Sequence, residues 1–310
     1  MAITVTQANF NGKAAGFYIS AALKASNSLD YLTTLENIKY KMNVQALNQT
    51  VDAVVDATCD FSSVGTLALT EKVLEPKNLQ VNMDLCKGTL LTSWEALQMK
   101  AGAGGAPSAT FEDYVISYMG DIIAEATEDS IWSGTNVAGQ FNGFLGAVTG
   151  YLIPGVDATV IQDAAAAVPY TAANIISNLQ SAVANIPTAA LGKEDLHIYL
   201  SQRSYQYYIS SQSTLGYVNA YNMNGDYIPM FEGYKLAVCN GMEENQMVVA
   251  QKSNLFFGTD LLSDGTEVGG GPRISLLDMS TLDGSDNLRM ICRYSAGVQT
   301  GTGADIVRQS

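Results

Sequence analysis

His197 is the only histidine of this 310-residue chain, so it is the one side chain whose ordinary pKa suits proton transfer near neutral pH. It lies in the run from Leu196 to Leu200, whose composition predicts a β-strand. A histidine within a strand and without a motif around it more often has a structural role, and we interpret His197 in that way. The helix of a zinc metalloprotease needs two histidines, so that class of enzyme is excluded.

Motifs for a nucleophile or for phosphate binding are missing from the sequence. A serine nucleophile would need a G-x-S-x-G turn, which does not occur. Three glycine-rich segments, 102–105, 269–271 and 301–303, lack the third glycine of a dinucleotide fingerprint, and there is no P-loop lysine. We interpret these segments as hinges and loops.

Residues that could bind a metal are also poorly arranged. The acids Asp260, Asp264 and Glu267 could supply oxygen ligands to Ca²⁺, but their order does not match an EF-hand, so a solvated loop is preferred and Ca²⁺ stays an open alternative. The four cysteines are far apart and include no C-x-x-C pair: Cys59, Cys86, Cys239 and Cys292. Reduced thiols in a reducing compartment are preferred over disulfides or metal ligands. The sequence therefore predicts no catalytic, cofactor or metal site, and favours structure or binding over enzymatic activity.

The charge of the chain limits its partners. It has 16 Lys plus Arg against 30 Asp plus Glu, which gives a net charge of −14. Such a surface does not bind phosphates tightly, although it is compatible with a protein that encloses nucleic acid without binding it. No run approaches the ~18 apolar residues of a membrane span, and residues 1–10 do not resemble a signal peptide.

The element predicted to lack a partner is a hairpin. Residues 66–74 and 79–86 read as strands, and Glu75 to Asn78 reads as the turn between them. The second strand alternates, with Leu79, Val81, Met83 and Leu85 on one face and Gln80, Asn82 and Asp84 on the other. A two-stranded hairpin cannot bury its own apolar face, so this one needs a third layer or another chain.

A long amphipathic helix follows the glycine-rich segment, from Thr110 to about Trp132. Its predicted apolar stripe is Phe111, Val115, Met119, Ile122 and Ala126. A largely acidic stripe on the far side comprises Asp113, Ser117, Asp121 and Glu128.

The remaining elements indicate a mixed α and β chain with a boundary after Trp132, where glycines become frequent. Helices are predicted at 12–25, 28–35, 90–99, 171–186 and 201–212, and strands at 54–61, 195–200, 234–239, 246–251, 273–279 and 288–298. Residues 37–48 are ambiguous between helix and strand, and 254–260 are predicted to hold a turn. The last strand is expected to return to the first domain.

The order of these elements resembles the major capsid proteins of tailed bacteriophages, which have the Hong Kong 97-type fold. The short phrases that support the resemblance are Ile131-Trp132-Ser133-Gly134, Phe141-Asn142-Gly143-Phe144-Leu145, Leu200-Ser201-Gln202-Arg203-Ser204-Tyr205 and Asn254-Leu255-Phe256-Phe257-Gly258-Thr259-Asp260-Leu261. The resemblance implies an α+β fold with an N-terminal arm, an extended hairpin loop, a peripheral domain with a long spine helix, and an axial α/β domain. The implied ranges are an arm with short helices at 1–50, the loop at 51–92, the peripheral domain at 93–150, the axial domain at 151–250, and closing β segments at 251–310 that return to the peripheral domain.

The resemblance also implies a function. The chain would be a shell subunit that assembles in the host cytoplasm, as hexamers and pentamers, into an icosahedral virion enclosing double-stranded DNA. A portal, a separate scaffolding protein and a decoration protein are the implied partners, and no membrane is involved. The candidate intersubunit contacts are Leu79, Val81, Met83, Leu85, Lys72 and Lys77.

Two features of the family are not matched in this sequence. Only about 50 residues precede the hairpin, fewer than a long N-terminal scaffolding segment would need. Some members cross-link their subunits through Lys, Asn and Glu, and that set cannot be assigned here. An encapsulin-type compartment shell and an α/β hydrolase-like enzyme built from scattered Asp, Ser and Tyr stay as alternatives.

Overall fold

The computed structural model describes residues 27–49, 56–57, 59, 67–86, 109–164, 169–214, 229–260, 274–279, 282 and 284–310. The helices predicted at 12–25 and 90–99, the strand predicted at 54–61 and the glycine-rich segment at 102–105 lie wholly or largely outside these residues. The described helices are α2 (Ala109–Ser133), α3 (Ile175–Ala184) and α4 (Gln202–Thr214), with 3₁₀ turns at Ser28–Tyr31, Lys252–Asn254 and Gly303–Asp305.

The described strands form three sheets, and the predicted α+β character is confirmed. The five-stranded sheet has the order β1-β10-β12-β11, with β4 also paired to β12. The six-stranded sheet has the order β5-β13-β9-β6-β8-β7, and β2 and β3 form a separate ribbon. The strands are β1 (Thr33–Leu35), β2 (Met42–Gln49), β3 (Leu67–Leu74), β4 (Lys77–Cys86), β5 (Ile161–Asp163), β6 (Leu196–Ser201), β7 (Met230–Phe231), β8 (Tyr234–Cys239), β9 (Met247–Gln251), β10 (Leu255–Thr259), β11 (Ile274–Asp278), β12 (Asn287–Thr300) and β13 (Val307–Gln309).

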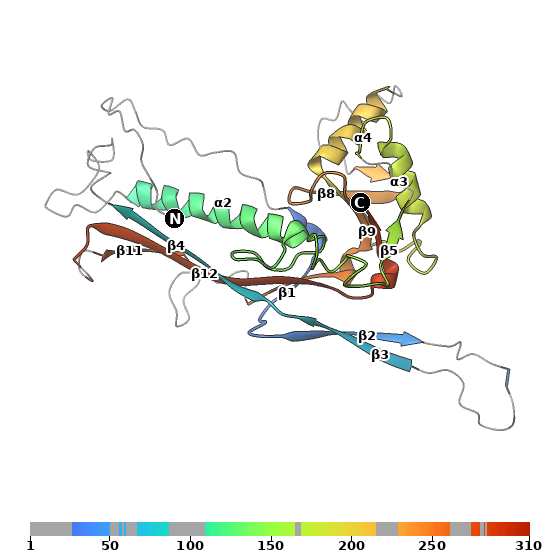
Figure 1. Cartoon of the computed structure of the whole chain (residues 1–310), viewed down its shortest axis with the longest axis horizontal. Coiled ribbons are helices and arrows are strands. Elements are labelled where there is room, and N and C mark those ends of the chain that lie inside the picture. The colour runs from blue at the N-terminus through green and yellow to red at the C-terminus, as the bar shows by residue number, and fades with distance from the viewer. Residues whose placement is uncertain are drawn as a thin grey trace.

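Figure 1 shows how these parts are arranged. Helix α2 runs along the five-stranded sheet, while α3 and α4 lie beside the six-stranded sheet. The β2–β3 ribbon projects away from both sheets. The molecule thus consists of a two-part body and one extension.

The predicted hairpin is wrong in its pairing. Strand β3 pairs with β2, from Met42 opposite Leu74 to Gln49 opposite Leu67, and β4 pairs with β12 instead. The connection between β3 and β4 is only Glu75 and Pro76, and Pro76 has no N–H with which to close a hairpin ladder. The β2–β3 ribbon therefore begins at Met42, and β4 belongs to the five-stranded sheet.

The apolar face of β4 is covered by the chain itself. The alternation predicted for this strand is confirmed, since Leu79 and Leu85 are buried and the residues between the apolar positions are exposed. A buried cluster joins β4 to α2 and to the matching face of β12, and it consists of Leu85, Met119, Leu288 and Met290 with Val81, Met83 and Ile122 packed against it. Helix α2 and β12 together supply the third layer that the sequence left open.

Helix α2 confirms the predicted long helix to within one residue at each end. Met119 is buried at 2% exposure and Asp121 is exposed, as the amphipathic pattern predicted. Glu128 is a correction, because it was placed on an outer acidic stripe but has 0% exposure. Ala126, predicted on the apolar stripe, is exposed instead, so the buried face of the last turns is not the one that the periodicity indicated.

The connector after α2, in which glycines are frequent, is well packed and does not form a loose series of turns. Phe141, Phe144 and Leu152 are buried, and Trp132 contacts Phe144 with 5.5 Å between ring centroids. At Gly143, an added Cβ would lie 2.5 Å from the carbonyl oxygen of Ser130, so only glycine allows this approach to the helix end. The segment fills the space between the two sheets.

Most of the strands predicted for the second half of the chain lie in the six-stranded sheet, and the predicted helices lie beside it (Figure 1). Helix α4 starts directly after β6, at the position predicted for the helix 201–212, and the Ser201 hydroxyl accepts a bond from the Ser204 amide at 3.2 Å, which caps the helix. One expectation is corrected here, because residues 255–259 form β10 rather than a turn. The strand predicted at 288–298 lies within β12, which pairs with β4 beside α2, as expected, and the short strand β13 joins the six-stranded sheet. The ambiguous segment 37–48 contains β2.

Candidate assembly site

The structure separates the six candidate contact residues into three environments. Leu79 and Leu85 are 9% and 7% exposed and pack inside the chain, and Val81 and Met83 pack against the same core. The apolar face of β4 that these four residues form is therefore covered within the chain itself. The two lysines have other surroundings.

Lys77 is bound to the connector after α2. Its ammonium group donates to the carbonyl oxygens of Val137 at 2.9 Å and Gln140 at 2.8 Å, and to that of Asn136 at 3.2 Å. The Asn136 side-chain oxygen is also 3.2 Å away, so the three donors of the ammonium group are fully satisfied by this connector. Lys77 therefore fixes the start of β4 on the body of its own chain.

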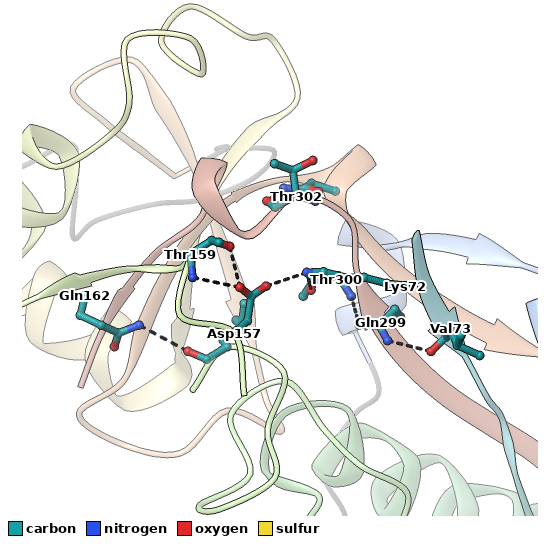
Figure 2. Close-up of polar contacts among 10 residues, drawn as sticks. Lys72, Val73, Asp157, Thr159, Gln162, Gln299, Thr300 and Thr302 are labelled. Carbon is teal, nitrogen blue, oxygen red and sulfur yellow. Dashed lines mark hydrogen bonds and ion pairs between the residues drawn. The ribbon is translucent and has the colours of Figure 1, made fainter. Parts of the chain in front are cut away.

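Lys72 lies where the ribbon leaves the body, as Figure 2 shows. Its ammonium group is 2.6 Å from Asp157 Oδ2 and donates to the Thr300 hydroxyl at 2.9 Å. The other carboxylate oxygen of Asp157 accepts from the Thr159 amide at 3.0 Å and from its hydroxyl at 2.5 Å. One carboxylate thus links β3 to β12 and to the segment before β5.

The electrostatics of this ion pair favour the charged form of the acid. Burial alone would raise the pKa of Asp157, but the hydrogen bonds from Lys72 and Thr159 outweigh that effect and hold the pKa below its ordinary value. The Asp157 side chain is 13% exposed and the Lys72 side chain 31%. The pair is therefore shielded more than a surface ion pair.

Further contacts fix the base of the ribbon. The buried amide of Gln299 donates to the Val73 carbonyl at 2.8 Å and accepts from the Thr300 amide at 2.9 Å (Figure 2). Leu74 is fully buried against β10, and a Cβ added at Gly258 would lie only 2.6 Å from its methyl group. The last residues of β3 are thus held by polar and apolar contacts at once.

Beyond this base, the ribbon has an uncovered apolar row. Leu67 is 72% exposed, Leu69 61% and Val73 42%, and their spacing places all three on one face of β3. The ribbon is a two-stranded sheet with no layer over this face among the described residues. The requirement for a partner that the sequence assigned to β4 belongs to this face instead.

A second polar centre joins α2 to the rest of the body. The Glu128 carboxylate accepts from the Ser28 amide at 3.1 Å, the Ser28 hydroxyl at 2.5 Å and the Gly241 amide at 3.2 Å. The Trp132 indole donates to the same hydroxyl at 2.6 Å. This fully buried carboxylate connects the N-terminal segment, α2 and the end of β8, which is a structural use of an acid.

The residues considered for catalysis do not form a catalytic arrangement. The Ser253 hydroxyl donates directly to the Asp195 carboxylate, whereas His197 Nδ1 contacts the Asp195 carbonyl oxygen at 2.7 Å. His197 is 8% exposed and packs beside Tyr31 and Tyr199, and this burial lowers its pKa. A histidine that does not lie between the serine and the acid cannot act as the base of a hydrolase. The geometry gives the hydrolase alternative no support.

Segment 301–303 lies in the connection from β12 to β13. The Asn254 side chain accepts from the Thr302 amide at 2.7 Å and donates to its carbonyl at 2.8 Å. A Cβ at Gly303 would lie 2.5 Å from Asp157 Oδ2, so the glycine makes room for a carboxylate and not for a phosphate. The interpretation as a structural loop agrees with this geometry.

The other candidate ligands are also placed. Asp260 forms an ion pair with Lys39 at 2.6 Å, while Asp264 and Glu267 lie outside the described residues. Within the described ranges, no three His, Cys, Asp or Glu side chains are grouped to hold a metal ion, and no helix is long and apolar enough to cross a membrane. The thiols of Cys59 and Cys86 are exposed, and burial raises the pKa of the Cys239 thiol.

Comparison with known proteins gives two different results. No protein-family model matches the chain, and no curated protein matches it in sequence. Solved structures do resemble it: 94% of the chain aligns with 88% of a chain from Gordonia phage Cozz, with a TM-score of 0.60 and 11% identity. The capsid of a native GTA particle aligns over 95% of this chain and 93% of its own, with a TM-score of 0.55 and 13% identity. The capsid of the cyanophage P-SCSP1u aligns over 95% of this chain and 90% of its own, with a TM-score of 0.55 and 12% identity.

The chain therefore has a capsid-subunit fold, shared over nearly its whole length with the GTA and cyanophage capsids. The resemblance to phage major capsid proteins is confirmed at the level of the fold, although identities this low carry no information about individual residues. The sequence reasoning missed Asp157 and the buried role of Glu128. The run Asp157-Ala158-Thr159 is a usable signal for Asp157, because an aspartate two residues before a threonine often closes a local turn.

Proposed function

We propose that this chain is the shell subunit of a tailed phage head, with a Hong Kong 97-type arrangement. The observation on which the proposal mainly rests is the β2–β3 ribbon, which is anchored firmly at its base and uncovered on its apolar face. In this assignment the ribbon is the extended loop, α2 with the five-stranded sheet is the peripheral domain, and the six-stranded sheet with α3 and α4 is the axial domain. The ribbon lies over a neighbouring copy.

The proposal includes the partners of such a subunit. Copies assemble as hexamers and pentamers around a portal, with the help of a separate scaffolding protein, in the host cytoplasm. The net charge of −14 supports a shell that encloses double-stranded DNA without binding it tightly. The finished particle is the virion.

The test replaces two leucines of the ribbon. Leu67→Asp together with Leu69→Asp replaces two of the three residues of the apolar row. Burial of each leucine against the neighbouring copy is worth about 1.5–3 kcal/mol, and the variant loses it. We expect a folded subunit whose threshold concentration for assembly rises at least about 100-fold, measured by light scattering and negative-stain microscopy. Val148→Asp is the control, since Val148 is 78% exposed but lies outside the ribbon.

Two results would overturn the proposal. One is a wild-type protein that stays monomeric at high concentration, both alone and when co-expressed with a scaffolding protein. The other is normal shell formation by the double variant, because the ribbon face would then have no role in assembly. Thermal melting and circular dichroism of the monomers show whether the variants are folded.

A further inference from the structure

Strand β12 has, on one edge, a short stretch with no strand partner among the residues that the structure describes. On its first edge it pairs with β4 without a break, from Asn287 to Ala296. On the other edge, β11 pairing ends at Cys292 and β10 pairing begins at Ala296. The three residues between, 293–295, line an open pocket of about 680 Å³.

The residues that line the pocket include polar members of two cross-strand pairs, together with Leu79, Tyr294 and Asp260. Arg293 lies opposite Gln80, and Ser295 lies opposite Asn78. Gln80, Asn78 and Arg293 are exposed, and alternation places them on the face opposite the buried residue Leu79. These three polar side chains therefore lie on the sheet face opposite the core.

Its charge is not balanced within the described chain. Asp260 lines the pocket but already pairs with Lys39 at 2.6 Å, and its amide donates to the Ser295 hydroxyl at 3.1 Å. Arg293 has no ion pair or hydrogen bond among the described residues, whereas Arg289, four residues earlier in the same strand, pairs with Asp84 at 2.9 Å. Within the described part of the chain, the Arg293 guanidinium group is thus left without an ion pair of its own.

We infer that Arg293 binds a carboxylate of a second copy of this chain. A guanidinium group flanked by amide side chains suits a carboxylate, which can accept two parallel N–H bonds. A second copy supplies such groups in excess, because the chain has 30 acidic residues against 16 Lys plus Arg. The contact is heterologous, between different surfaces of two copies, and this kind of contact builds rings. The inference rests on the proposed shell function.

The first test changes the charge of the pocket. Arg293→Glu should raise the threshold concentration for assembly about tenfold or more, because two carboxylates would then face each other. Arg293→Lys keeps the charge and should lose less. The matched control is Arg289→Gln, which removes a guanidinium group from the same strand and face but one that is already neutralised by Asp84; it should leave the threshold unchanged.

The second test identifies the occupant. A photoreactive p-benzoylphenylalanine in place of Gln80 is irradiated in particles assembled from equal amounts of ¹⁴N- and ¹⁵N-labelled subunits. Mass spectrometry should show cross-linked peptides that combine the two labels and include an acidic segment. Cross-links confined to one label would show that the chain's own residues fill the pocket, and would overturn the inference.

The outcomes separate this inference from the proposal on which it rests. If the wild-type protein forms no assemblies, the shell function itself fails. If the wild-type protein and Arg293→Glu assemble at the same threshold, with the same dependence on salt, the shell function stands and the contact through Arg293 is rejected.

Discussion

Asp157 has a larger role than its place in a loop would indicate. Its carboxylate accepts hydrogen bonds from Lys72 of the ribbon and from Thr159 of its own turn. Lys72 in turn donates to Thr300 of β12, which links Asp157 to that strand. Each of these contacts is local, yet together they determine where an extension of two strands leaves the body. Glu128 has a comparable role at the end of α2.

The replacement Asp157→Asn tests this role. It removes the ion pair and leaves the Lys72 ammonium group without its charged partner, so we expect the free energy of unfolding to fall by about 1–3 kcal/mol at pH 7. Urea denaturation of the monomer measures the change. Lys193→Ala, at an exposed position, serves as the control and should change stability by less than about 0.5 kcal/mol.

The same variant predicts a pH dependence. The folded-state pKa of Asp157 is depressed relative to an unfolded value near 3.9, so its contribution is fully present above about pH 4 and is lost as the pH falls through the folded pKa. The difference in stability between wild type and Asp157→Asn should therefore be constant from pH 7 to about pH 5 and shrink below about pH 4. A difference that stays the same at pH 3 would contradict the assigned ion pair.

Among the elements, β4 is the strand for which the difference between the predicted and the observed pairing matters most. The sequence predicted the strand and its alternation correctly, because period-2 patterning reports which residues share a face. It did not predict the partner, because β12 lies about 200 residues further along the chain and pairing between distant strands leaves no local signal. The nearness of β3 across Glu75 and Pro76 made a hairpin the simpler interpretation.

A pair of neighbouring substitutions in β4 separates the two interpretations. Met83→Asp places a charge in the core shared by α2 and β12, and we expect it to destabilise the isolated subunit by about 2–4 kcal/mol. Asn82→Asp changes the adjacent residue on the exposed face and should cost less than about 0.5 kcal/mol. If Met83→Asp left the monomer as stable as wild type, the face would instead be open for contact with another copy.

The other differences between the predicted and the observed structure also come from contacts or patterns that carry no clear local signal. Helix α2 was predictable because its apolar period is a local signal, but Glu128 was misplaced because periodicity assumes that only one face is buried. Its partners, Ser28 and Gly241, are 100 and 113 residues away in sequence. The ribbon face was missed for a simpler reason: β2 lay in a segment whose pattern fits a helix and a strand equally well.

For the whole molecule, the last strand is the feature with the widest effect. Strand β13 lies between β5 and β9, Val307 and Gln309 are each 1% exposed, and the Gln309 amide is bonded to Tyr170, Asp163 and Asn178. Only six residues separate it from β12, which is central to the other sheet. Residues 287–309 thus complete both sheets.

Deletion of residues 307–310 should therefore prevent folding of the whole second sheet. Removing β13 leaves β5 and β9 without their shared neighbour and exposes buried apolar surface, so we expect insoluble protein or a lost thermal transition. Ser310→Ala, at an exposed position, should behave as wild type. A soluble deletion protein with an unchanged melting temperature would contradict the central place given to β13.

The order in which a ribosome makes the chain gives this arrangement a further consequence. The ribbon strands leave the ribosome early, while the strands that complete both sheets are made last. Until residues 287–309 are available, β4 has no β12 to pair with and the ribbon has no fixed base, so a nascent chain cannot present a finished contact surface to other copies. For the shell function proposed above, association between copies would therefore follow the synthesis of residues 287–309.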